Sequence, residues 1–182
     1  MAHQLVILSG PPHAGKSAAA EALCQRYDRM IHIEVGVLRD CLRMGRLRPW
    51  DESLEGRRQR ELLIASACDM ARRFLDAGYG AVIDDVVTPD DLPAYREALA
   101  AVGQAVHFVV LLPPLDVVLA REQERSTEWH RSGRLEPLCA RFAAWEGIAA
   151  IDPNRLAPEL VADRIMALAA EGRALLHQAA SA

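Results

Sequence analysis

The chain has 182 residues, of which 51% are hydrophobic and 25% are charged, a size and composition typical of a single globular domain with a buried core. Its formal net charge of −4 argues against a protein that binds nucleic acid or a membrane surface by neutralising phosphates. No apolar run approaches the roughly 18 residues that span a bilayer, and the first residues lack a signal-peptide layout, so we expect a cytoplasmic protein.

Apolar, strand-like runs alternate with longer helical patterns along the chain, which is typical of repeated βα units and a parallel sheet. The expected strands are residues 4–8, 30–33, 80–83, 105–112 and 147–151. The expected helices are residues 16–27, 37–44, 55–77, 89–102, 115–125, 135–145 and 158–171. Glycine and proline lie at the joints between these runs, as at Gly78 and Pro113. The sequence therefore predicts an α/β fold with five parallel strands, and we expect residues 1–182 to form a single domain.

A phosphate-binding motif follows the first expected strand. Residues 10–17 match the pattern G-x-x-x-x-G-K-[ST] in full, and they lie between a strand and a helix, as the motif requires. The glycines let successive backbone N–H groups point into one concavity, Lys16 is placed to reach the β and γ phosphates, and the Ser17 hydroxyl is placed to bind Mg²⁺. We therefore predict that ATP with Mg²⁺ is bound by Gly10, Pro11, Pro12, His13, Ala14, Gly15, Lys16 and Ser17.

Lys16 is the only lysine in a chain with 20 arginines. A compact ammonium on a flexible stem suits this position of the loop, whereas a planar guanidinium is too bulky for it. Regulatory GTPases read guanine with an N-K-x-D motif, which needs a second lysine. We therefore do not expect a GTPase switch.

With this loop and this order of elements, the chain resembles the small P-loop kinases, the group of chloramphenicol phosphotransferase, gluconate kinase and shikimate kinase. These are relatives among the AAA-type P-loop phosphotransferases, and adenylate kinase is a more distant one. The resemblance covers nearly the whole chain. It implies a three-layer P-loop NTPase fold with strand order 2-3-1-4-5, a helical insert that binds the acceptor, and a lid that bears arginine. The matching segments here are residues 35–60 for the insert and 126–134 for the lid.

Carboxylates follow the second and third expected strands. In kinases of this group, an Asp two or three residues beyond the second strand accepts the acceptor's proton, but Gly36 and Val37 occupy those places here. Glu34, at the end of the strand, is the nearest carboxylate that could replace it, and Asp40 lies about one turn into the next helix. The third strand ends at Asp84-Asp85, at the edge where ligands bind in open α/β sheets. The resemblance implies that Asp84 holds Mg²⁺ through water or handles the acceptor, whereas Asp85 is expected to begin the turn.

Two arginines, Arg121 and Arg125, share one face of the helix that precedes the expected lid. The resemblance implies that such a segment closes over ATP and places guanidinium groups on the phosphoryl group in transfer. Both arginines are therefore candidate ATP-binding residues, and Arg125 joins Lys16, Glu34 and Asp84 as a candidate catalytic residue. The alternative is a solvated basic end of a helix. The six histidines show no spacing typical of metal ligands.

These features favour an ATP-dependent phosphotransferase that moves the γ-phosphate to a hydroxyl of a small molecule, for example an antibiotic. A nucleotide or nucleoside kinase is one alternative, because arginines at 39, 43, 46 and 48 could bind an acceptor phosphate. The carboxylates at the strand ends would repel such a phosphate, and we therefore favour an alcohol. A nucleotide-binding protein without phosphotransfer is the other alternative, because the usual base is missing. Either a monomer or a homodimer is compatible with the sequence.

Overall fold

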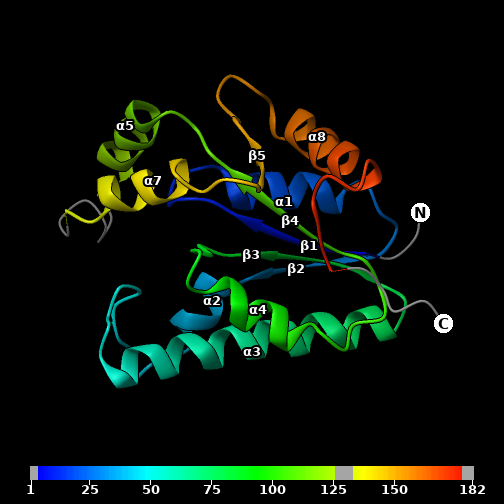
Figure 1. The fold of residues 1–182 in the computed structure, drawn as a ribbon, viewed down its shortest axis with the longest axis horizontal. Coiled ribbons are helices and arrows are strands. Elements are labelled where there is room, and N and C mark those ends of the chain that lie inside the picture. Colours follow the sequence, from blue (N-terminus) through cyan, green and yellow to red (C-terminus); the bar gives the residue numbers. More distant parts are fainter. Residues whose placement is uncertain (1–3, 126–132, 178–182) are drawn as a thin grey trace.

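The computed structural model describes residues 4–125 and 133–177. Five strands form a parallel sheet in the order β2-β3-β1-β4-β5, which confirms the expected fold (Figure 1). They are β1 (Leu5–Ser9), β2 (Met30–Glu34), β3 (Gly80–Asp84), β4 (Val106–Leu111) and β5 (Ala149–Ile151). Because all five run in the same direction, their carboxyl ends meet at one edge of the sheet.

A sixth strand, β6 (Leu175–His177), pairs with β4 in the antiparallel direction and was not expected from the sequence. Gly172, with φ of 69°, ends the preceding helix in the left-handed region, and the chain then turns back toward the sheet. The backbone N–H of Phe108 donates a hydrogen bond to the carbonyl of Ala174 at 2.7 Å. Three residues are too few to show the alternation that identifies a strand in a sequence.

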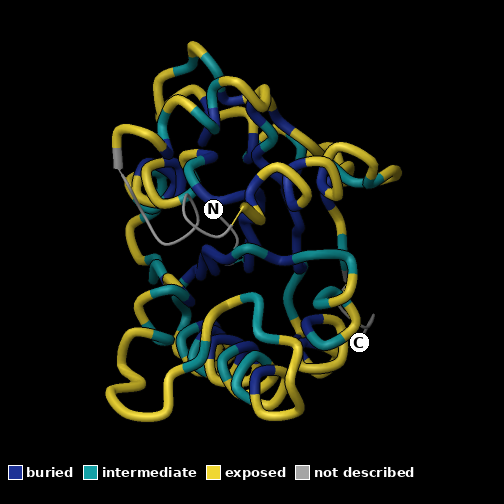
Figure 2. The backbone as a smooth tube through the Cα atoms, turned by 90° about the vertical axis from the view of Figure 1, so that its left-hand side faces the viewer, coloured by how far each residue is buried: buried dark blue, intermediate teal, exposed yellow. Residues whose placement is uncertain are grey.

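Helices cover both faces of the sheet in three layers, as Figure 1 shows. One face carries α1 (Lys16–Cys24) and α8 (Pro158–Ala170), and the other carries α3 (Leu54–Asp76) and α4 (Leu92–Ala98). The side chains of β1 alternate between the two apolar cores: Leu5 and Ile7 pack on the α3 side, whereas Val6 and Leu8 pack on the α1 side. Figure 2 views the carboxyl edge of the sheet, with buried strands inside and exposed helix turns outside.

Among the described residues, the other helices are α2 (Val35–Asp40), α5 (Leu115–Arg125) and α7 (Leu135–Ala143). The helix expected over residues 89–102 begins later, at Leu92, because the Asp91 carboxylate accepts hydrogen bonds at 2.8 Å from the backbone N–H and the hydroxyl of Thr88 and closes a turn there. The second expected helix lies earlier than residues 37–44: α2 begins directly at the end of β2 and already ends at Asp40. Within the described ranges, no helix is both long enough and apolar enough to cross a membrane.

Candidate active site

The loop that joins β1 to α1 has the backbone of a tight, glycine-dependent turn. Gly10 has φ of 136° and Gly15 has φ of 91°, values that favour glycine. A Cβ atom on Gly10 would also collide with the carbonyl oxygen of Leu111 on β4. His13 is a non-glycine residue at φ of 65°, so its conformation must be held by contacts. The loop therefore has a fixed shape at the carboxyl end of the central strand.

Lys16 and Ser17 are the first two residues of α1. The Lys16 ammonium donates hydrogen bonds to the carbonyls of Gly10 (3.1 Å) and Pro11 (3.0 Å). Burial lowers the pKa of Lys16 from its ordinary value, and nearby carboxylates, Asp84 foremost, oppose that shift. The ammonium is thus folded over the loop, with carboxylates close by to favour its charged form.

Asp84 ends β3 and is buried next to α1. The Ser17 hydroxyl donates to its Oδ2 atom at 2.6 Å. Burial alone would raise the pKa of Asp84, but the nearby imidazole of His32, the charge of Lys16 and the hydrogen bond from Ser17 hold it below its ordinary value. Asp84 is therefore an ionised carboxylate beside the first turn of α1. A hydroxyl and a carboxylate are hard oxygen donors, so the pair suits Mg²⁺.

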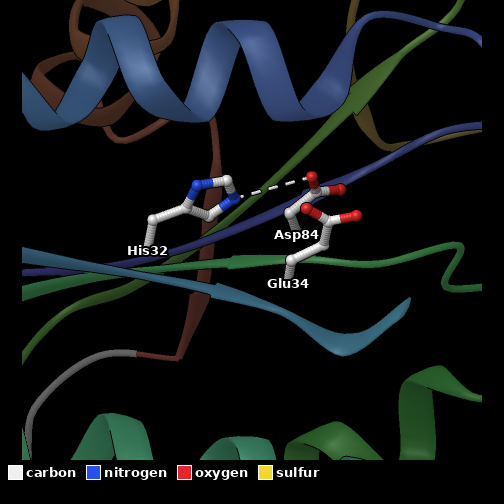
Figure 3. Close-up of side chains that lie close together, drawn as sticks. All are labelled: His32, Glu34 and Asp84. Carbon is white, nitrogen blue, oxygen red and sulfur yellow. Dashed lines mark ion pairs between the residues drawn. The ribbon is translucent and has the colours of Figure 1, made fainter. Parts of the chain in front are cut away.

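Glu34 lies directly opposite Asp84 in the register of β2 and β3. His32, two residues earlier on β2, points to the same side, and its Nε2 atom lies 3.6 Å from Asp84 Oδ2 (Figure 3). The structure thus brings Lys16, Ser17, Glu34 and Asp84 together at one edge of the sheet, as the sequence predicts. The alternative base, Asp40, instead forms an exposed ion pair with Arg46 at 2.6 Å.

A cavity of about 930 Å³ opens beside these carboxylates. Its walls come from the phosphate loop, α2, the connection over residues 47–52, α3, the segment after β3, and α7. Lys16, Ser17, Glu34 and Asp84 all line it, and so does the aromatic ring of Trp50. The expected insert over residues 35–60 supplies one wall. The cavity is therefore large enough for a small molecule beside the phosphate loop.

A buried charge network lies on the same wall, and sequence reasoning missed it. Arg60 on α3 pairs with Asp85 at 2.8 Å and with Asp91 at 2.9 Å, and the Tyr95 hydroxyl donates to Asp85 at 2.7 Å. Asp85 does more than begin the turn after β3, because this network holds it in the core. The pairing partners come from α3 and from the segment after β3, so no local spacing in the sequence could have indicated them.

Helix α5 holds the phosphate loop through His13. The Arg121 side chain donates to the His13 carbonyl at 2.9 Å, so the predicted ATP-binding residue Arg121 does lie beside the loop. The His13 side chain pairs with the carboxylate of Glu122, and both side chains are buried. Glu122 was not expected to have a role. Arg125 is the last residue of α5, but its side chain and residues 126–132 of the expected lid lie outside the described residues.

We expect Arg60→Met to lower the free energy of unfolding by about 3 kcal/mol, because two carboxylates would lose their buried cation. The Arg60 side chain is 24% exposed, and those of Asp85 and Asp91 are 8% and 16% exposed. The matched control is Arg173→Met, whose pair with Glu171 is 69% and 55% exposed, and which should cost less than about 1 kcal/mol. Urea unfolding at neutral pH measures both values, and equal costs would contradict the prediction.

The pH dependence of this difference has a definite sign. Burial would raise the pKa of Asp91, but Arg60 and the hydrogen bonds from Thr88 hold it below its ordinary value. The contribution of the pair is therefore complete above the unfolded pKa of about 4 and is lost as the pH falls through the lower, folded value. The gap in stability between wild type and Arg60→Met should shrink in acid. A difference in the free energy of unfolding that grows as the pH falls would contradict this prediction.

Comparisons with solved structures show the same fold in several proteins. The tunicamycin resistance protein of Deinococcus radiodurans superposes with a TM-score of 0.67 at 21% identity, over 95% of this chain and 98% of that one. The APS kinase of Mycobacterium tuberculosis, in complex with AMPPNP and APS, gives 0.68 at 16% identity over 93% and 98%. The shikimate kinase of Acinetobacter baumannii, in complex with shikimate, gives 0.60 at 18% identity over 94% and 95%. At these identities, the likeness establishes the fold.

Sequence comparison adds the family. No curated protein matches the chain in sequence. The model of a family described as AAA domain matches residues 5–137, which include the phosphate loop, both carboxylate-bearing strand ends and α5. With its loop, its strand order and this match, the chain belongs to the AAA domain family and has the fold of the small P-loop kinases.

Proposed function

We propose that the protein transfers the γ-phosphate of ATP to a hydroxyl group of a small molecule. One observation carries this proposal: Lys16 and Ser17 of the phosphate loop share one cavity with the carboxylates of Glu34 and Asp84. A phosphate-binding loop alone would suit any nucleotide-binding protein. A loop that faces carboxylates across a cavity also offers what transfer to an alcohol requires, namely a proton acceptor beside the bound phosphates.

The nucleotide would bind on the loop side of this cavity. The backbone of residues 10–17 would hold the phosphates, Lys16 would turn from the Gly10 and Pro11 carbonyls to the γ-phosphate, and Arg121 would lie beside the same loop. Arg125 and the lid over residues 126–134 would close over ATP. Ser17 would bind Mg²⁺ directly, and Asp84 would reach it through water. The ion supplies positive charge to the phosphate oxygens during transfer.

The acceptor would bind on the side of α2 and α3. Glu34 directly precedes α2, is exposed, and lines the cavity, so its carboxylate would accept the proton of the attacking hydroxyl. This assignment replaces the Asp that related kinases carry two or three residues beyond the second strand. The cavity is also lined by apolar side chains, those of Trp50, Leu63 and Pro137. These side chains support an acceptor that has an apolar part.

The charges favour an alcohol over a nucleoside monophosphate. Arg60 lines the cavity, but two carboxylates already bind its guanidinium, so it is not available to clamp a phosphate. Glu34 and Asp84 would repel an acceptor phosphate at the sheet edge. Arg39 and Arg57 also line the cavity and keep a nucleotide kinase as the second candidate. The names of two neighbours, a tunicamycin resistance protein and a shikimate kinase with bound shikimate, support antibiotics and small alcohols as acceptors to test.

Release of ADP in a coupled assay distinguishes the candidates. Wild-type protein with ATP and Mg²⁺ would be offered hydroxyl-bearing antibiotics, sugars, shikimate-like alcohols and nucleoside monophosphates, with Lys16→Ala as the inactive control. We expect release that depends on an alcohol. ADP release with a nucleoside monophosphate and with no alcohol would overturn the proposal of an alcohol acceptor. Arg39 would then be the candidate that binds the acceptor phosphate. Bound ATP with no release for any acceptor would favour a nucleotide-binding protein without transfer.

A further inference from the structure

A histidine lies against the carboxylate pair and has no part in the proposed transfer. The ligand atoms of His32, Glu34 and Asp84 lie within 4.8 Å of one another, and the three residues come from two adjacent strands. Figure 3 shows the imidazole of His32 aimed at the Asp84 carboxylate, with the Glu34 carboxylate beside it. The arrangement was invisible in the sequence because the third ligand is on β3. Residues 32 and 34 alone show only that two side chains share one face of a strand.

The geometry of the three side chains suits a shared cation. Metal ions such as Zn²⁺ bind nitrogen and carboxylate oxygen at about 2.0–2.2 Å, so two ligands of one tetrahedral ion lie about 3.3–3.6 Å apart. His32 Nε2 and Asp84 Oδ2 are 3.6 Å apart, and that nitrogen is buried without a hydrogen bond that meets geometric criteria. The exposed Glu34 side chain can swing to complete the set. A hydrogen bond between His32 Nε2 and Asp84 Oδ2 would need a distance shorter than 3.6 Å, whereas two ligands of one bridging cation lie about 3.6 Å apart.

Electrostatics point to the same conclusion. Glu34 and Asp84 are directly opposite each other on neighbouring strands, where like charges destabilise the sheet. The single lysine, Lys16, is close enough to lower the pKa of Asp84, but it directs its hydrogen bonds to the Gly10 and Pro11 carbonyls of the loop. A divalent cation between the carboxylates would remove the repulsion. Imidazole is a favoured ligand of Zn²⁺ and Co²⁺, whereas Mg²⁺ prefers oxygen ligands, so the donor set selects the transition metals.

We propose that His32, Glu34 and Asp84 form a binding site for a divalent transition-metal cation of the Zn²⁺ or Co²⁺ type in the nucleotide-free protein. This site is different from that of the Mg²⁺ that accompanies ATP, because it uses an imidazole nitrogen and does not use the Ser17 hydroxyl. The two sites share Asp84, so they compete. A cation held by Glu34 also occupies the proposed proton acceptor and would inhibit transfer.

Titration of nucleotide-free wild-type protein with Co²⁺, followed by visible absorption and then by displacement with Zn²⁺, tests the proposal. We expect one Co²⁺ per chain, with the intense visible bands of a low-coordinate nitrogen and oxygen site. His32→Gln should weaken the affinity for Co²⁺ and Zn²⁺ at least tenfold. The same variant should not change the affinity for Mg²⁺ measured in the absence of nucleotide. Circular dichroism shows whether the variant is folded, and Glu34→Gln, which alters an exposed side chain, serves as a second ligand variant.

Asp69→Asn is the matched control. It removes an exposed carboxylate of α3 that pairs with Arg72 and is no ligand of the new site, so it should keep its affinity for Co²⁺. No Co²⁺ or Zn²⁺ binding at millimolar concentration, or affinities that neither His32→Gln nor Glu34→Gln changes, would overturn the proposal. Because the titration contains no nucleotide or acceptor, its result is independent of whether the protein proves to be a kinase.

Discussion

Lys16→Ala is expected to lower turnover at least a hundredfold, because it removes the one lysine of the chain from the phosphate loop. The ammonium lies between the Gly10 and Pro11 carbonyls at 3.1 and 3.0 Å, close to where the phosphates would bind. Lys16→Arg should be nearly as inactive, since a planar guanidinium cannot replace a compact ammonium in this space. Calorimetric titration with Mg²⁺–ATP and the ADP-release assay measure binding and turnover.

Arg26→Ala is the control for this prediction. Arg26 follows α1, and its ion pair with Asp163 on α8 lies on the surface, away from the loop. Its loss should leave turnover as in wild type, since an exposed surface ion pair contributes little to stability. Equal ATP affinity and equal turnover in Lys16→Ala and wild type would contradict the role of the loop.

Asp84→Asn is expected to lower turnover by about a hundredfold while the affinity for nucleotide changes only a few-fold. The amide oxygen can still accept the Ser17 hydrogen bond, so the first turn of α1 keeps its partner. The negative charge is lost, and with it the water-mediated hold on Mg²⁺. Separate measurements of kcat and of the dissociation constant for Mg²⁺–ATP distinguish a loss of turnover from a loss of nucleotide affinity.

Asp69→Asn is the matched control for the loss of one carboxylate, because Asp69 is an exposed residue of α3 that pairs only with its neighbour Arg72 among the ion pairs described. It should leave both quantities unchanged. If Asp84→Asn weakened nucleotide binding as much as it lowered turnover, Asp84 would be a binding residue and not one that acts in transfer.

The parts of the site that the sequence predicts are those with a local pattern. The phosphate loop is contiguous, and its strand and helix adjoin it, so the positions of Lys16 and Ser17 follow from residues 4–27 alone. The runs that form β2 and β3 are short and mostly apolar, and each ends in a carboxylate, which places Glu34 and Asp84 at their carboxyl ends. Their meeting follows from the parallel register.

The parts that the sequence does not predict depend on contacts between distant segments. Arg60 belongs to a long amphipathic helix, and only the docking of α3 against the segment after β3 brings it to Asp85 and Asp91. Glu122 has the spacing of an ordinary helix residue until α5 packs its side chain against His13. Propensity and periodicity describe one element at a time, so they carry no information about such pairs.

Phosphorus NMR of the reaction with ATP, Mg²⁺ and an alcohol that promotes ADP release tests the central proposal most directly. We predict a new phosphate monoester signal in an amount equal to the ADP formed, and no such signal with Lys16→Ala. ADP accompanied only by inorganic phosphate would mean that water is the acceptor, and it would contradict transfer to an alcohol.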